Sequence, residues 1–295
     1  MSAMSFSFSG RPRRSEHPSS SPAPAARDWA ALPRDLLSAV FLRLGPREVM
    51  LGAELACTAW RRAAADEPAL WRRVGVDWYG WPEPPDRRAS VGTTIAMARA
   101  ALRRSAGRCE AFEGCFGDHD DLLLLVGRTP GLKSLSLYRY GKHKYTEELI
   151  MTLKKLPLLE DLVIKLPYED DPDQSLFGSV CQACPNLKKL SLMFIYPYMP
   201  YVIHPTDGGT IQIMCELRFL KLSDCHLSAE GLSMILDNCP SLEHLEISGG
   251  FHGVMDNELL MKCAKVKNIT LPAACSEEFY DSEEYDFEDG DELLD

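Results

Sequence analysis

The chain has 295 residues, of which 45% are hydrophobic and 25% are charged, as is usual for a protein with one or two packed domains. The longest uninterrupted apolar run, residues 122–126, is far shorter than the ~18 residues that cross a bilayer. Residues 276–295 hold eleven of the 43 acidic residues and no Lys or Arg, which leaves 32 acidic against 32 basic residues elsewhere. The net charge of −11 therefore belongs to the tail, and we expect neither nucleic acid nor membrane as a partner.

Residues 1–27 are rich in Ser, Pro and Arg and carry no apolar stretch of the kind found in a secretory signal. We interpret them as a disordered leader, with an organelle transit peptide as the alternative. Ten cysteines are scattered through the chain. We expect their thiols to be reduced and the protein to reside in the nucleus, the cytoplasm or both.

Residues 28–74 predict a small module of three helices. Pro33 stands where a helix can begin, and apolar residues at helical spacing follow it: Leu36, Leu37, Val40, Phe41 and Leu44. Gly45-Pro46 ends this helix, a second is expected at residues 49–51, and a third carries residues 55–60. Because about forty residues bury little apolar surface, we expect a partner protein to complete the module.

Residues 75–104 form a connector, which begins with the sequence WYGWPEPPDRR and continues as a predicted helix. From residue 105 to 272 the pattern L-x-x-L-x-L recurs at intervals of 23 to 30 residues. The copies begin at Cys109 (a degenerate one), Leu132, Leu159, Leu187, Leu217, Leu242 and Val266. Leucine-rich repeats have a period of about 20–29 residues, and their alternating leucines face one side of a strand. The sequence predicts an α/β leucine-rich-repeat solenoid, with parallel strands on its concave face and helices outside, after an N-terminal all-α module.

The helical module resembles the F-box family. The matching residues are Leu32-Pro33, Leu36-Leu37, Val40, Leu42, Leu44, Cys57, Trp60-Arg61 and Leu70-Trp71, whereas Ala56 stands where many members have Val. With its repeats and Trp/Pro connector, the chain resembles a plant F-box/leucine-rich-repeat subfamily of substrate receptors in Skp–cullin–F-box ubiquitin ligases. The resemblance implies a Skp-type adaptor as partner and, through it, cullin and RING subunits. It implies these adaptor contacts: Leu32, Pro33, Leu36, Leu37, Val40, Leu44 and Trp60.

Two motifs suggest chemistry but have structural interpretations that we favour. Cys181-Gln-Ala-Cys184 has the spacing of a zinc or redox site, but no second pair accompanies it. Cysteines also recur late in the segment between strands (Cys184, Cys239, Cys263), as small buried hydrophobes do. Residues 118–121 are either an acid–base cluster or the start of a helix. We expect no metal, cofactor or catalytic residue, the rival being an enzyme with an unrecognised site in residues 194–209.

On each strand, the residues between the leucines face the concave surface, and their mixed character suits a protein substrate. Residues 194–209, rich in Tyr, Met and Pro, form either a binding loop or a loop that packs on its own repeat. We expect these residues to contact the substrate: Tyr138, Met193, Tyr196, Tyr198, Tyr201, Phe219, Lys221 and His244. The acidic tail, residues 273–295, is disordered and solubilising, or contacts a basic partner or the repeat surface. The alternative function is that of a Skp-bound F-box regulator that acts without cullin or ubiquitination.

Overall fold

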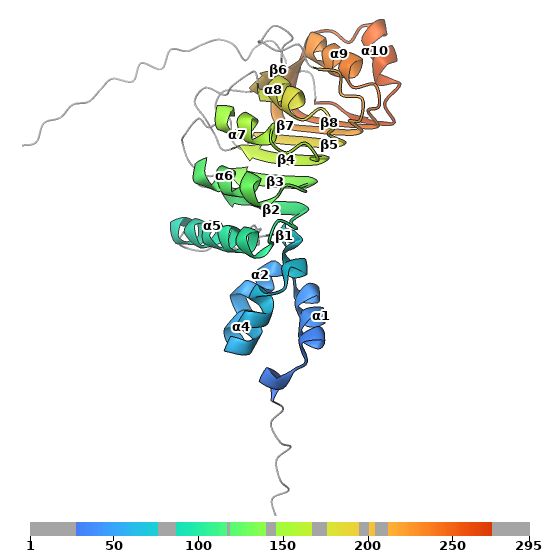
Figure 1. Cartoon of the computed structure of the whole chain (residues 1–295). Coiled ribbons are helices and arrows are strands. Elements are labelled where there is room, and N and C mark those ends of the chain that lie inside the picture. Colours follow the sequence, from blue (N-terminus) through green and yellow to red (C-terminus); the bar gives the residue numbers. More distant parts are fainter. Residues whose placement is uncertain are drawn as a thin grey trace, which may run out of the picture.

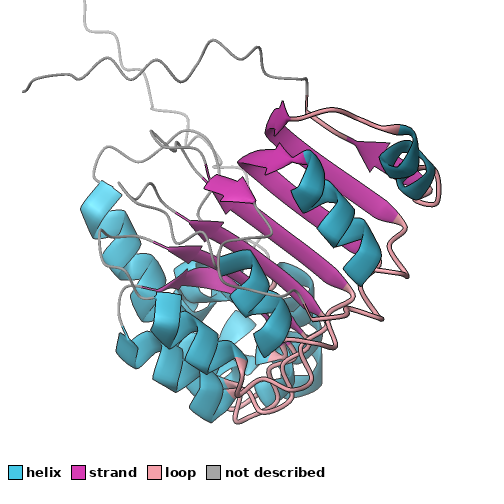
Figure 2. Ribbon diagram, turned by 90° about the horizontal axis from the view of Figure 1, so that it is seen from above, coloured by secondary structure: helices cyan, strands magenta, loops and turns pink. Residues whose placement is uncertain are grey.

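A computed structural model describes residues 28–75, 87–116, 119–139, 146–166, 176–194, 201–203 and 212–272. Within these ranges a small helical module leads into a stack of parallel strands (Figure 1). Figure 2, which looks down the stack, shows helices along one face of the curved sheet. No helix among the described residues has the length and apolar character needed to cross a membrane.

The N-terminal module is all helical, as predicted, but its second and third helices are divided differently. Its elements are η1 (Trp29–Ala31), α1 (Arg34–Leu44), α2 (Pro46–Glu48), η2 (Val49–Ala53), α3 (Glu54–Ala56), α4 (Thr58–Ala65) and η3 (Pro68–Trp71). Residues 46–56 form one continuous helical run. Cys57 is extended (φ −160°) and caps α4, because its Sγ accepts a hydrogen bond from the backbone N–H of Trp60 at 3.5 Å. The predicted third helix therefore begins after Cys57, not before it.

The strands form one parallel sheet and confirm the predicted solenoid. Their order is β1 (Arg73–Gly75), β2 (Ala111–Phe116), β3 (Ser134–Arg139), β4 (Asp161–Leu166), β5 (Lys189–Phe194), β7 (Phe219–Ser228), β8 (His244–His252) and β9 (Asn268–Thr270). The second leucine of each repeat aligns across neighbouring strands, as with Leu162, Leu190 and Leu220. These side chains are fully buried, so the predicted pattern defines the core of the array.

Helices connect most of these strands and cover the buried face of the sheet. They are α5 (Arg87–Arg104), α6 (His119–Arg128), α7 (Thr146–Leu153), α8 (Leu176–Ala183), α9 (Ala229–Asn238) and α10 (Asn257–Cys263). Ser228 and Asp256 cap α9 and α10, accepting hydrogen bonds from the N–H groups of Gly231 (3.0 Å) and Leu259 (2.7 Å). The connector helix α5 packs on β1, β2 and α6, so it belongs to the repeat array.

Strands β7 and β8 run beyond the leucine pattern, a feature that the repeat motif does not predict. The register shifts between Leu222 and Cys225, and Cys225 then pairs with Gly249. Gly249 has φ +124°, and a Cβ there would lie 2.0 Å from the carbonyl oxygen of Cys225, so only glycine fits. The short strand β6 (Tyr201–Ile203) pairs with the same extension of β7 on its other side.

Candidate functional site

Helix α1 carries apolar side chains on two faces. Leu37 and Phe41 point into the core, whereas Leu36, Val40 and Leu44 recur every fourth residue and are 56%, 40% and 45% exposed. An ordinary surface helix is polar on its outer face. We call Leu36, Val40 and Leu44 the α1 face; its apolar character indicates a surface that another protein covers.

The structure corrects one predicted adaptor contact. Leu37 is only 3% exposed, because it lies in the hydrophobic core of the module, and so it supports α1 from within. Pro33 is exposed directly before α1, and Leu32 is half-buried beside it. Trp60 packs edge-to-face on Phe41, with ring centroids 5.9 Å apart. Among the predicted adaptor contacts, Leu37 is therefore the one whose side chain is buried in the core.

A shallow hollow lies beside Trp60 in the same module. Trp29, Ala30, Ala56 and Cys57 line it together with Trp60. The indole N–H of Trp60 donates a hydrogen bond of 2.9 Å to the backbone oxygen of Trp29, which fixes the start of the module against α4. Two of the five lining residues, Ala30 and Ala56, have small side chains.

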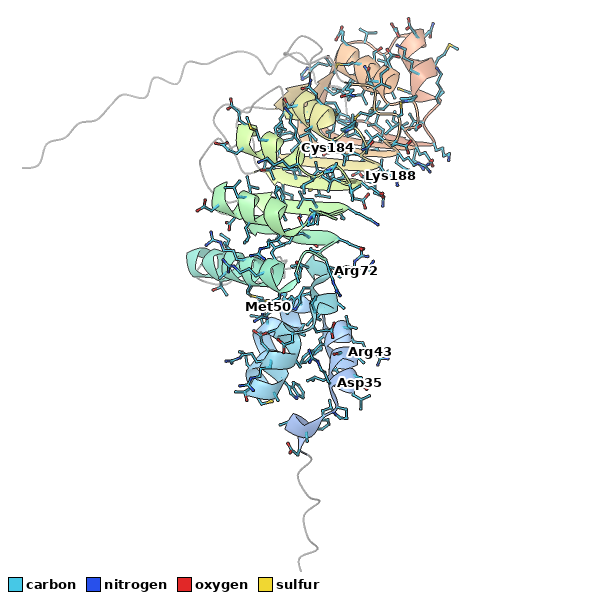
Figure 3. All side chains as sticks on the ribbon, in the orientation of Figure 1. Asp35, Arg43, Met50, Arg72, Cys184 and Lys188 are labelled. Atoms are coloured by element: carbon cyan, nitrogen blue, oxygen red, sulfur yellow. The ribbon has the colours of Figure 1, made fainter. Side chains whose placement is uncertain are left out.

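Charged residues flank the α1 face. Figure 3 labels Asp35 and Arg43 on α1, and both are exposed. Asp35 lies in the first turn and Arg43 in the last, so each charge is favourably placed relative to the helix dipole. An apolar centre with a charged rim is the usual arrangement of a protein–protein interface.

The module is joined to the repeats through Arg104, at the end of α5. Its guanidinium lies 4.9 Å from the centre of the Trp71 ring and forms an ion pair of 2.7 Å with Glu54. Glu54 is nearly buried, and Trp71 is fully buried and donates its indole N–H to the backbone oxygen of Ala64 at 2.9 Å. These contacts fix the orientation of the α1 face relative to the sheet.

The concave surface gathers four predicted substrate contacts on three adjacent strands. Phe219 lies between Lys189 and His244 in register, and its ring is 6.1 Å from that of His244. Lys221 forms an ion pair of 2.6 Å with Glu246 on the next strand. Met193 on β5 is half-buried. This part of the surface therefore combines apolar side chains with an ion pair.

Other predicted substrate contacts are not defined by the structure. Tyr196 and Tyr198 lie outside the described residues. Tyr138 and Tyr201 lie in β3 and β6, but only their backbone is described. Ser191, which the alternation of the strand predicts on the concave surface, is 8% exposed because it sits between Val163 and Lys221 on neighbouring strands. The concave surface is thus more crowded at its centre than the alternation suggests.

A row of charged residues runs along the edge where the strands begin, and its charges alternate except at the neighbours Lys188 and Arg218. The residues are Arg72, Glu110, Lys133, Glu160, Lys188, Arg218, Glu243 and Lys267. Ion pairs join Arg72 to Glu110 (2.7 Å), Lys188 to Glu160 (3.0 Å) and Lys267 to Glu243 (2.8 Å). Figure 3 shows Arg72 and Lys188 on this same edge. The hydrogen bond from Arg72 lowers the pKa of Glu110, and that from Lys267 lowers the pKa of Glu243.

We call this row the charge ladder. Its members are exposed or half-buried, so each pair contributes little to stability, but the opposite charges of the ion-paired neighbours favour the observed register. Sequence inspection could have found the ladder, because each member stands directly before the first concave-facing residue of its strand.

The cysteines of the inter-strand helices have the structural role expected for them. Burial raises the pKa of Cys184 and Cys239 to about 12, and that of Cys181 further above its ordinary value. Their thiols stay protonated near neutral pH and are poor nucleophiles and metal ligands. Asp121, from the predicted acid–base cluster, is buried at the start of α6 and forms an ion pair with Arg99, which gives it a structural role. The described residues contain no group of three or more metal-ligating side chains.

Comparison with known proteins gives the same two parts. An F-box-like family model matches residues 29–77. The chain is 32% identical over 255 residues to putative F-box/LRR-repeat protein 23 of Arabidopsis thaliana, spanning 83% of this chain and 54% of that protein. It is 31% identical over 294 residues to F-box protein SKIP19 of the same plant, spanning 93% of this chain and 92% of the relative. It is 30% identical over 252 residues to putative F-box/LRR-repeat protein 22 of the same plant, spanning 83% of this chain and 77% of that protein. The chain belongs to the plant F-box/leucine-rich-repeat family.

Proposed function

We propose that this F-box protein is the substrate-recognition subunit of a Skp–cullin–F-box ubiquitin ligase. The α1 face carries the proposal, because it is an exposed apolar stripe on a folded module that matches the F-box-like model. A Skp-type adaptor covers this face and links the chain to cullin and RING subunits. The protein substrate binds the concave surface around Phe219, Lys221 and His244.

In this proposal the chain is an adaptor without catalytic chemistry of its own, as is general in its family. It holds a substrate lysine near a conjugating enzyme and raises the effective concentration of the reacting groups. Such a mechanism needs a fixed separation between the two binding surfaces. The contacts of Arg104 with Glu54 and Trp71 support this, because they tie the F-box to the first strand and helix of the repeats.

We place this activity in the nucleus, the cytoplasm or both. The support is the set of free, buried cysteines in the described part of the chain, which suits a reducing compartment. The concave surface has neither a basic nor an acidic excess, which favours a folded protein or peptide over nucleic acid as substrate.

The proposal is tested by co-expression of the full chain with a Skp-type adaptor, a cullin and its RING subunit. We expect the intact chain to co-purify with all three, and a Leu36→Glu, Val40→Glu variant to lose all three. Because both positions are exposed, this variant should keep its circular dichroism spectrum and its melting temperature. Recovery of the adaptor without the cullin would instead favour a Skp-bound regulator that does not act in ubiquitination.

A further inference from the structure

Two histidines face each other beyond the bulge in β7 and β8, the extended strands of the upper stack in Figure 1. The Nδ1 atom of His226 lies 2.6 Å from the Nε2 atom of His252, and the ring centroids are 4.9 Å apart, so the two rings meet end to end. Both side chains are half-buried. Neither residue takes part in the adaptor face or in the predicted substrate contacts.

The backbone explains this close approach. After the bulge His226 pairs with Gly250, and His252 pairs with Ser228, so the two histidines are diagonal neighbours on adjacent strands. Gly250 presents no side chain opposite His226, which leaves room for the imidazole to lean toward His252. Gly249 has no side chain, which allows the two strand extensions to approach closely at Cys225.

Two ring nitrogens at this distance share a proton. A neutral imidazole has one N–H and one lone pair, so a hydrogen bond forms when one facing nitrogen carries the proton. If each ring places its proton on the outer nitrogen, both lone pairs face the gap between the rings, and a cation that enters this gap can accept both. We propose that His226 and His252 chelate a divalent transition-metal ion of the zinc, nickel or copper type.

A shared ion requires the two rings to rearrange. Zinc–nitrogen bonds are about 2.0–2.1 Å long, and a tetrahedral angle then separates the two nitrogens by about 3.3 Å. The rings must therefore part by less than ~1 Å, and each must turn by about 35° so that its lone pair points at the ion and not at the other nitrogen, which rotations about the side-chain bonds of two half-buried residues supply. Imidazole nitrogen is a preferred ligand for zinc, copper and nickel, and poor for magnesium or calcium.

Two protein ligands leave coordination positions open. Water, or a histidine or carboxylate of a bound protein, can fill them. The site lies on strands that also carry Phe219 and His244, although at their opposite ends. A metal ion here would therefore give a bound partner a point of contact separate from Phe219 and His244.

The experiment uses the full chain without a histidine tag and with Cys215→Ser, since Cys215 is the exposed thiol among the described cysteines. Ni²⁺ and Zn²⁺ are titrated by calorimetry. We expect one ion per chain, and at least a tenfold weaker Kd after either His226→Gln or His252→Gln. His244→Gln is the matched control, because His244 is an exposed histidine at the opposite end of β8 from His252. This variant should leave the Kd of the metal ion unchanged.

A Co²⁺ spectrum identifies the ligands. Nitrogen and oxygen ligands give weak visible bands only, and we expect these bands to disappear in both variants. A strong near-ultraviolet band from thiolate ligands would place the ion on cysteine and overturn the proposal. An unchanged Kd in both variants would also overturn the proposal. So would the absence of saturable metal binding by the parent chain, which would mean that the two histidines only share a hydrogen bond. Circular dichroism melts without metal verify folding, and if one variant fails to fold the other decides. Adaptor binding is independent of all these outcomes.

Discussion

Replacing the α1 face with alanine should separate adaptor binding from folding. Burying a whole leucine or valine side chain contributes about 1.5–3 kcal/mol. About half of each of Leu36, Val40 and Leu44 is still exposed, so the adaptor gains about 1 kcal/mol from each. The triple alanine variant should lose about 3 kcal/mol of binding free energy, which raises Kd for the adaptor about 100-fold. Alanine is a better helix former than either residue, so the free energy of unfolding should change little.

The assay is surface plasmon resonance with a purified Skp-type adaptor, together with urea unfolding of each variant. Leu37→Ala is the matched control on the same helix. It removes a buried side chain and should lower the free energy of unfolding by about 2–5 kcal/mol. A triple variant that binds the adaptor with unchanged Kd would refute the assignment of the α1 face. A triple variant that unfolds as readily as Leu37→Ala would show that the face belongs to the core.

Three further predictions concern the body of the chain. Leu190→Ala should lower the free energy of unfolding, measured with urea, by about 2–5 kcal/mol. Lys189→Ala, on the exposed side of the same strand, should change it by less than about 0.5 kcal/mol. Equal effects would contradict the strand register. Arg104→Ala should lower the free energy of unfolding by about 2 kcal/mol, which is less than the loss expected for a fully buried ion pair. It should also widen the distribution of distances between spin labels on the F-box and on the repeats. Replacing the exposed neighbour, Arg103→Ala, should have neither effect. At pH 8 a thiol reagent should label Cys215 in the folded chain and the buried helix cysteines only after denaturation, because their raised pKa keeps them as thiols; rapid labelling of all would contradict their burial.

The repeat array could be predicted because one physical rule fixes it many times. Each L-x-x-L-x-L copy alternates at the period of a strand, and the constant interval requires a return to the same sheet edge. The parallel register of Leu162, Leu190 and Leu220 follows directly. The helix caps at Ser228 and Asp256 were predictable for a similar reason, since a short polar side chain before an apolar run satisfies the first free N–H groups.

What the sequence did not reveal depends on contacts between distant segments. Leu36 and Leu37 are identical residues, and only the packing of α1 decides which one is buried. The pair of Arg104 with Glu54 joins residues 50 positions apart. His226 and His252 meet because a bulge shifts the register of β7 against β8, and no repeat pattern specifies a bulge. The charge ladder differs from these, because its spacing was visible and needed only to be read together with the strand register.

The F-box module shares its hydrophobic core with the repeats. Its small size suggests that the module is unstable alone, but Leu70, Trp71 and Val74 belong to one continuous core that extends through the repeats. The first strand begins at Arg73, directly after the module. The repeats therefore cover the inner side of the F-box, and we expect the module to fold on them without an adaptor. The α1 face would then be ordered before binding, and association would not include the entropy cost of ordering that helix.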